Sequence, residues 1–137
     1  DGGEVITPFN DGEEVDLVST SNQLYGKKGD RINFNRQMLT FTENARKCTY
    51  KLYFPKPLDG GEVAFKYNDG KVLAINFGKE LSCLGFWVDD GLKNGRCVGI
   101  EPCTRGYDTV YNAQEKGQYG GIDANGELKF SLKINVK

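Results

Sequence analysis

The sequence predicts an all-β protein whose strands form an antiparallel β-sandwich. Short segments rich in β-branched and aromatic residues recur along the chain, separated by turn-forming residues, at a spacing typical of a sandwich. The composition agrees, because 18 glycines, 4 prolines and an aromatic content of 12% suit strands joined by tight turns. A length of 137 residues fits one domain, so we treat residues 1–137 as a single β-sandwich domain.

Few strands are predicted in the first part of the chain. Residues 1–30 are weakly periodic, and only residues 15–18 resemble a strand there. Residues 37–42 and 47–54 are the next two candidates. The second of them ends before two closely spaced prolines, because proline cannot continue a sheet ladder.

Two pairs of strands are predicted in the middle of the chain. Residues 63–67 and 71–77 are β-rich and flank Asp69-Gly70, a strong hairpin signal because glycine accepts a positive φ. Residues 81–88 then run into a polar turn, and residues 96–103 return from it. Each pair is therefore expected to be antiparallel.

The C-terminal segment alternates between apolar and polar residues without interruption. This pattern predicts one long strand over residues 128–136, with one buried face and one face in water. We expect Phe130, Leu132 and Ile134 to be buried. A helix of one or two turns over residues 109–115 is the only helix that the sequence suggests.

Charge and cysteine content narrow the classes of partner. A net charge of −1 gives no electrostatic reason to expect binding to nucleic acid or to an anionic membrane. No apolar run approaches the ~20 residues of a membrane-spanning helix. The chain has no histidine and no Cys-x-x-Cys pair, so we expect neither a metal site nor another cofactor.

The four cysteines bear on the compartment. Free, mostly buried thiols would fit a reducing cytoplasm, and disulfides would fit an exported, for example periplasmic, protein. Cys97 and Cys103 could bridge only if the chain turned sharply near Pro102. The sequence favours the cytoplasmic alternative without deciding the location.

The candidate site lies around Glu101. In a strand, Gly99 and Glu101 share one face, and a glycine inside a strand often marks close approach by a ligand or another backbone. Pro102 also biases Glu101 towards extended geometry. If the two neighbouring strands pair in an even register, Trp87 lies on the same face, where its ring could stack on a sugar whose hydroxyls bind the carboxylate. In the alternative, Trp87 is in the core and Glu101 is an ordinary surface charge.

Several short motifs resemble the galactose-mutarotase-like proteins of the aldose 1-epimerase superfamily. In order, they are Leu84-Gly85-Phe86-Trp87, Gly99-Ile100-Glu101-Pro102-Cys103-Thr104, Tyr107-Asp108 with Asn112-Ala113, and Ile122-Asp123-Ala124-Asn125-Gly126-Glu127 before the last strand. The resemblance covers residues 84–136, under half of the chain, and rests on the order and spacing of the motifs.

The resemblance implies a hexose site and a catalytic role. It implies that Glu101 matches the general base that takes the proton from the anomeric hydroxyl, while a histidine protonates the ring oxygen. It also implies a sugar-binding role for Asp108. The family's other sugar-binding aspartate has no clean match, although Glu43 could substitute for it. Because this chain has no histidine, the family's general acid is absent.

The resemblance further implies that the chain is the C-terminal portion of a longer sandwich domain. Three functions stay open: hexose binding within a mutarotase-like parent, a non-catalytic carbohydrate-binding module, and a structural or interaction sandwich. Either residues 1–54 supply the second sheet and the chain is a monomer, or the uncovered face is buried by symmetric self-association. We favour closure by the chain itself.

Overall fold

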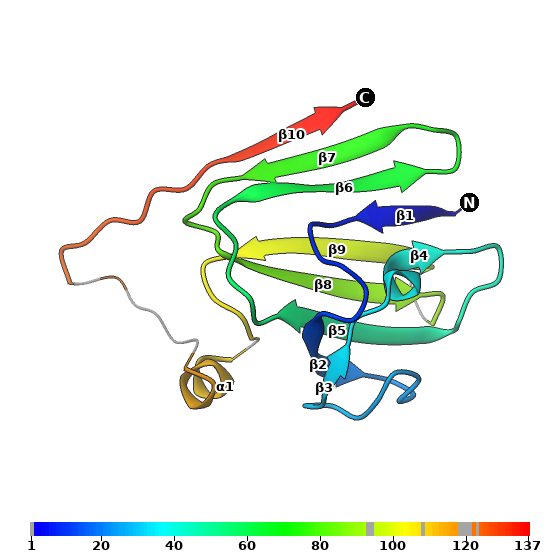
Figure 1. Cartoon of the computed structure of the whole chain (residues 1–137), viewed down its shortest axis with the longest axis horizontal. Helices are drawn as coiled ribbons and strands as arrows, with labels where there is room; N and C mark the ends of the chain where they lie inside the picture. Colours follow the sequence, from blue (N-terminus) through cyan, green and yellow to red (C-terminus); the bar gives the residue numbers. More distant parts are fainter. Residues whose placement is uncertain (1, 93–94, 108, 118–121, 123) are drawn as a thin grey trace.

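The computed structural model describes residues 2–92, 95–107, 109–117, 122 and 124–137. Within these residues the chain forms an all-β sandwich of two five-stranded antiparallel sheets (Figure 1). Sheet A contains, in spatial order, β10 (Leu132–Val136), β7 (Val72–Phe77), β6 (Gly61–Tyr67), β1 (Gly3–Ile6) and β4 (Thr40–Phe41). Sheet B contains β3 (Arg31–Asn33), β2 (Glu14–Thr20), β5 (Cys48–Phe54), β8 (Cys83–Asp90) and β9 (Arg96–Cys103).

The predicted hairpins and the short helix are present. Strands β6 and β7 pair around Gly70, whose φ is 88°, and β8 pairs with β9. Helix α1 (Val110–Glu115) begins after Thr109, whose hydroxyl accepts a hydrogen bond from Asn112 N at 3.1 Å. Among the described residues, no helix is long and apolar enough to cross a membrane.

The prediction for the N-terminal part was incomplete. Strands β1 and β3 carry no clear periodic signal, and the predicted strand at 37–42 begins as a 3₁₀ helix, η1 (Arg36–Leu39), before β4. The side chain of Asn35 accepts a hydrogen bond from Gln37 N at 2.9 Å, which caps this turn. In β1 a glycine is needed, because a Cβ on Gly3 would lie 2.6 Å from the ring of Phe65.

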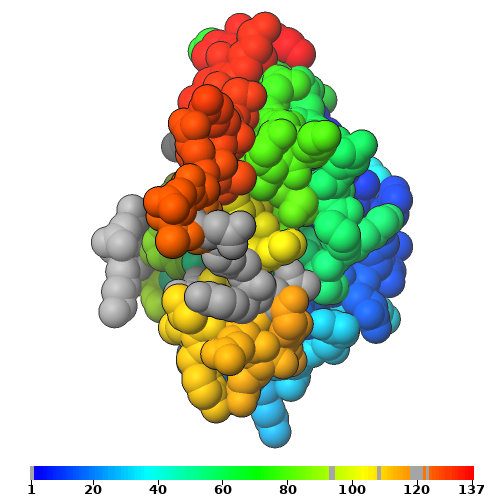
Figure 2. All heavy atoms as spheres, turned by 90° about the vertical axis from the view of Figure 1, so that its left-hand side faces the viewer, coloured from blue at the N-terminus to red at the C-terminus, as the bar shows by residue number. Residues whose placement is uncertain are grey.

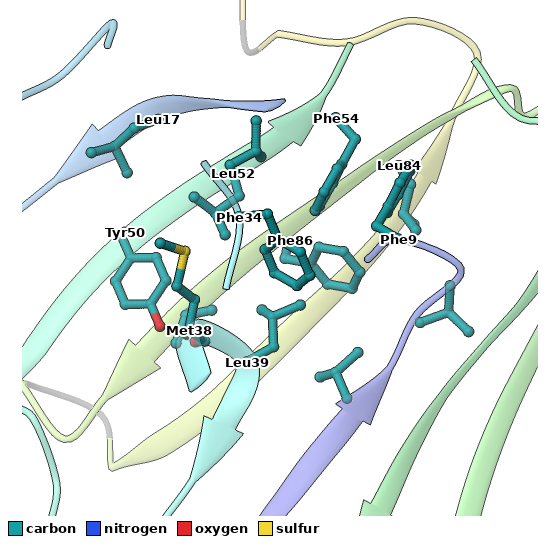
Figure 3. Packing of buried hydrophobic residues seen from close by; sticks show 14 of the residues in the cluster. Phe9, Leu17, Phe34, Met38, Leu39, Tyr50, Leu52, Phe54, Leu84 and Phe86 are labelled. Atoms are coloured by element: carbon teal, nitrogen blue, oxygen red, sulfur yellow. Dashed lines mark hydrogen bonds between the residues drawn. The ribbon is translucent and has the colours of Figure 1, made fainter. Parts of the chain in front are cut away.

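Aromatic and aliphatic side chains from both sheets fill the space between them (Figure 3). The ring of Phe9 stacks on that of Phe54 with centroids 3.6 Å apart, and Phe34 and Phe86 meet Phe54 edge-on at 5.0 and 6.0 Å. All four of these rings are buried. The core therefore gathers under β5 and β8, the two central strands of sheet B.

Residues 1–54 complete the sandwich, as expected, but not as one sheet. Strands β2, β3 and β5 join β8 and β9 in sheet B, whereas β1 and β4 join sheet A. The N-terminal segment thus contributes to both layers.

The prediction of a long buried C-terminal strand was wrong. Strand β10 begins only at Leu132, and Phe130, Leu132 and Ile134 are 58%, 49% and 65% exposed. Leu132 pairs with Phe77, the last residue of β7, so β7 does not extend beside residues 128–131. β10 is also the edge strand of sheet A and lies at the end of the molecule away from the bulk of sheet B (Figures 1 and 2). Alternation marks two unlike faces, but within the described residues no second layer covers the apolar one.

Candidate functional site

The outer face of sheet B brings three of the predicted site residues together, namely Trp87, Gly99 and Glu101. In the β8–β9 ladder Gly85 pairs with Glu101 and Trp87 pairs with Gly99. This is the even register that places Trp87 beside Glu101. Trp87 is half-buried on the outer face, whereas its neighbours Phe86 and Val88 are buried in the core. The alternative with Trp87 in the core is thus wrong.

The carboxylate of Glu101 has two polar neighbours from β5. Lys51 Nζ lies 3.1 Å from Glu101 Oε2, and the hydroxyl of Tyr53 donates to the same oxygen at 3.2 Å. Burial, and secondarily the charge of Glu101, raises the pKa of Tyr53 to about 12, so the phenol keeps its proton near neutral pH. The side chain of Glu101 stays 35% exposed and can still meet a ligand.

Two glycines on this face have different roles. A Cβ on Gly85 would lie 2.3 Å from Tyr53 Cε1, so the tyrosine ring lies directly over that backbone. A Cβ on Gly99 would meet nothing closer than Trp87 Cβ, at 3.6 Å. Gly85 is therefore the position of close approach, by Tyr53, whereas a methyl group at Gly99 would make only ordinary contacts beside Trp87.

A second polar group holds the segment after β9 over the outer face. The hydroxyl of Tyr107 donates a hydrogen bond to Asp16, and Arg31 Nε lies 2.7 Å from Asp16 Oδ1. Burial would raise the pKa of Asp16, but the hydrogen bonds from Arg31 and Tyr107 outweigh it and lower that pKa. The ring of Tyr107 lies 5.9 Å from that of Tyr53, centroid to centroid. The Tyr107 backbone has a φ of 76°, uncommon for a residue with a side chain.

Sequence analysis assigned no site role to Lys51, Tyr53, Asp16 or Tyr107, although Tyr107 stands in one of the motifs of the family resemblance. A signal existed for the first two, because they stand two residues apart on one strand and share a face. Which strand lies beside β8 could not be inferred from that spacing.

Of the other two predicted sugar-binding residues, the structure describes only Glu43, which lies away from this site. Asp108 lies outside the described residues. Glu43 is exposed in the loop after β4, next to Thr42, whose carbonyl accepts a hydrogen bond from Arg96. Arg96 begins β9, and Glu101 follows five residues later, which corresponds to about 17 Å of strand. The structure therefore does not bring Glu43 to Glu101.

The four cysteines form no disulfide with one another. Cys48 and Cys83 are buried, whereas Cys97 is exposed. Cys97 and Cys103 stand at opposite ends of β9, so they cannot bridge. Burial raises the pKa of Cys103 to about 12, which leaves almost no thiolate at neutral pH. In the described part of the chain, no three His, Cys, Asp or Glu residues are grouped to hold a metal ion.

The molecule also has an apolar cleft between the two sheets. Its volume is about 480 Å³, and its walls come from the inner face of sheet A and from β9. The lining residues are Gly2, Phe41, Phe65, Tyr67, Leu73, Ile75, Arg96, Cys97, Val98 and Ile100. The cleft lies on the opposite side of β9 from Glu101, because Val98 and Ile100 alternate with Gly99 and Glu101. It is a separate feature from the polar site.

The outer face of sheet B thus offers a partly exposed indole, a carboxylate and an ammonium group around Gly99. Such a set can hold a small polar molecule that has one apolar face. The chain matches no protein-family model, no curated protein and no solved structure at a significant level.

Proposed function

We propose that this chain binds a carbohydrate, most simply a hexose, on the outer face of sheet B. The observation that carries the proposal is the outward position of Trp87 beside Gly99 and the Glu101–Lys51 pair. The indole would stack on the apolar face of the sugar ring. Glu101 would accept hydrogen bonds from two hydroxyls, and Lys51 would donate to a third oxygen.

A catalytic role for Glu101 belongs to a mutarotase-like parent rather than to this chain alone. Exchange of anomers needs a base at the anomeric hydroxyl and an acid at the ring oxygen. Glu101 can serve as the base, but the chain contains no histidine to serve as the acid. Tyr53, with its pKa raised to about 12, holds its proton too tightly to replace it. We therefore expect binding without mutarotation at an enzyme-like rate.

The single tryptophan makes binding directly observable. We expect glucose, galactose or another hexose to change the fluorescence of Trp87, with a dissociation constant in about the millimolar range. Glu101→Gln keeps the size of the side chain but removes its charge, and should weaken binding about tenfold. Gly99→Ala adds a methyl group beside Trp87 and should weaken binding without unfolding the protein. Glu62→Gln, an exposed substitution on β6, is the matched control.

The result can contradict the proposal in two ways. If no hexose or short oligosaccharide changes the Trp87 signal, the outer face is not a sugar site and a structural or interaction role is favoured. If Glu101→Gln and Glu62→Gln bind equally well, the carboxylate is a surface charge. Polarimetry on fresh α-glucose and α-galactose tests the catalytic part, since a Glu101-dependent acceleration by this chain would overturn it.

A further inference from the structure

The outer edge of β10 is a row of backbone groups that point away from the sheet. Lys137 and Val72 exchange both of their backbone hydrogen bonds, at 2.9 Å each. Because such pairs alternate in an antiparallel ladder, residues 133 and 135 also bond to β7. The N–H and C=O groups of Leu132, Ile134 and Val136 therefore face the open edge. In the described part of the chain, no strand lies on that side.

The same three residues also present an apolar row. Their side chains share the face of Leu73 and Ile75, which line the cleft, and they are 49%, 65% and 76% exposed. A single exposed apolar residue needs no explanation, but a continuous row on an unpaired edge is a template for strand pairing. The alternation continues back through Leu128 and Phe130, beyond the end of β7. The alternating pattern therefore predicts a longer strand than the part that pairs with β7 within one copy of the chain.

Residues 127–137 are complementary to themselves in the antiparallel direction. If two copies pair about Leu132, then Phe130 meets Ile134 of the second copy, and Leu128 meets Val136. On the other face, Glu127 meets Lys137, Lys129 meets Asn135, and Ser131 meets Lys133. Every apolar residue then has an apolar partner, and no two like charges are opposite.

Neighbouring registers fit less well. Pairing about residue 133 would put Lys133 opposite Lys133 and Lys129 opposite Lys137, which is unfavourable. Pairing about Ile134 would place residues 127–130 opposite positions beyond 137, outside the alternating segment. Only pairing about Leu132 uses the whole alternating segment. It also joins even-numbered residues to each other, and these are the ones whose backbone groups face the edge.

We propose that two copies of this chain associate through β10, antiparallel across a two-fold axis at Leu132, so that sheet A continues from one protomer into its partner. The ion pairs that residues 127–137 form within one copy of the chain oppose this association only weakly. Glu127 is 3.2 Å from Lys129 and Lys137 is 4.0 Å from Glu62, but all four side chains are largely exposed. Exposed ion pairs of this kind contribute little and can exchange partners.

Disulfide trapping tests the register. In a Cys97→Ser background, which removes the exposed native thiol, Leu132→Cys places two thiols opposite each other at the axis. The Cα atoms of such a pair are about 5.5 Å apart, within the range of a disulfide. Ile134→Cys is the matched control on the same face, and its two thiols would be about 13 Å apart along the strands. We expect a cross-linked dimer from Leu132→Cys and none from Ile134→Cys. Equal cross-linking of the two, or cross-linking of Ile134→Cys alone, would overturn the proposal.

Sedimentation of the unmodified chain tests the association itself. We expect a reversible dimer whose dissociation constant rises at least about tenfold in Ile134→Pro, since proline removes an N–H that faces the edge. The β7 ladder keeps its hydrogen bonds in this variant, and circular dichroism checks its fold. A chain that stays monomeric up to about 1 mM, or an Ile134→Pro variant that is folded and dimerises as before, would refute the pairing. If Ile134→Pro does not fold, the cysteine comparison decides.

Discussion

At the scale of single residues, the absence of a side chain at Gly85 is what allows the Glu101 site to form. Tyr53 reaches Glu101 only because its ring can lie on the bare backbone of Gly85. The opposite face of the same strand is core, so the local sheet cannot shift to make room. The two outward glycines, Gly85 and Gly99, therefore provide a direct comparison.

We expect Gly85→Ala to destabilise the protein by about 1–3 kcal/mol, because the new methyl group overlaps the ring of Tyr53. Gly99→Ala should change the free energy of unfolding by no more than about 0.5 kcal/mol, because its methyl group meets only ordinary contacts. Urea titration followed by circular dichroism measures both. Equal destabilisation by the two substitutions would mean that the position of the Tyr53 ring does not depend on the missing side chain at Gly85.

At the scale of elements, β10 and β8 are extremes of burial. Seven of the eight residues of β8 are buried, and it lies between β5 and β9. In β10 no residue is buried, and among the described strands its backbone pairs with β7 alone. Local opening costs little free energy where few apolar contacts are lost.

We therefore expect the amides of β10 to exchange with solvent at least about 100-fold faster than those of β8, although the odd-numbered residues of β10 are hydrogen-bonded. Hydrogen exchange followed by mass spectrometry measures this at low protein concentration. Strand β6, which is paired on both sides, is the control in the same sheet and should exchange more slowly than β10. Equal protection of β10 and β8 in the monomer would contradict the expectation.

At the scale of the whole molecule, one buried carboxylate ties the two sheets together. Asp90, at the end of β8, binds Arg46 and, at 2.7 Å, Arg96. Arg46 in turn donates to the carbonyls of Gln37, at 2.7 Å, and Thr40, at 3.3 Å. Thr40 belongs to β4 in sheet A, so this network joins the sheets at one end of the sandwich.

We expect Asp90→Ala to lower the free energy of unfolding by about 3 kcal/mol at neutral pH, because it leaves two partly buried guanidinium groups without their anion. The exposed Glu4→Ala is the control and should change that free energy by less than about 0.5 kcal/mol. Urea titration gives the comparison. Similar midpoints for Asp90→Ala and Glu4→Ala would show that the network contributes little.

The same carboxylate gives the stability a pH dependence. Burial would raise the pKa of Asp90, but the hydrogen bonds from Arg46 and Arg96 outweigh it and hold the pKa below its unfolded value of about 3.9. Its contribution is therefore complete above about pH 4 and is lost as the pH falls through the folded pKa. The stability difference between the original protein and Asp90→Ala should shrink over that range.

The sequence by itself determined the fold class, the two central strand pairs and the face that Gly99 and Glu101 share, whereas the register of β8 against β9, which brings Trp87 to that face, came from the structure. The first three features depend on local rules, namely turn chemistry and the two-residue period of a strand, so neighbouring residues are enough to define them. The same rules failed for β1, which has no turn signal or period of its own and is held by β6 and β4.

Only the tertiary structure decided which residues meet from distant strands and which apolar face is covered. Lys51 and Tyr53 reach Glu101 because β5 and β9 both flank β8, and a strand order of this kind leaves no trace in local periodicity. The exposure of Phe130 and Ile134 could not be predicted from the sequence, for a related reason. Alternation reports that the two faces of a strand differ, whereas burial requires a second layer above one of them, and sheet B does not extend over β10.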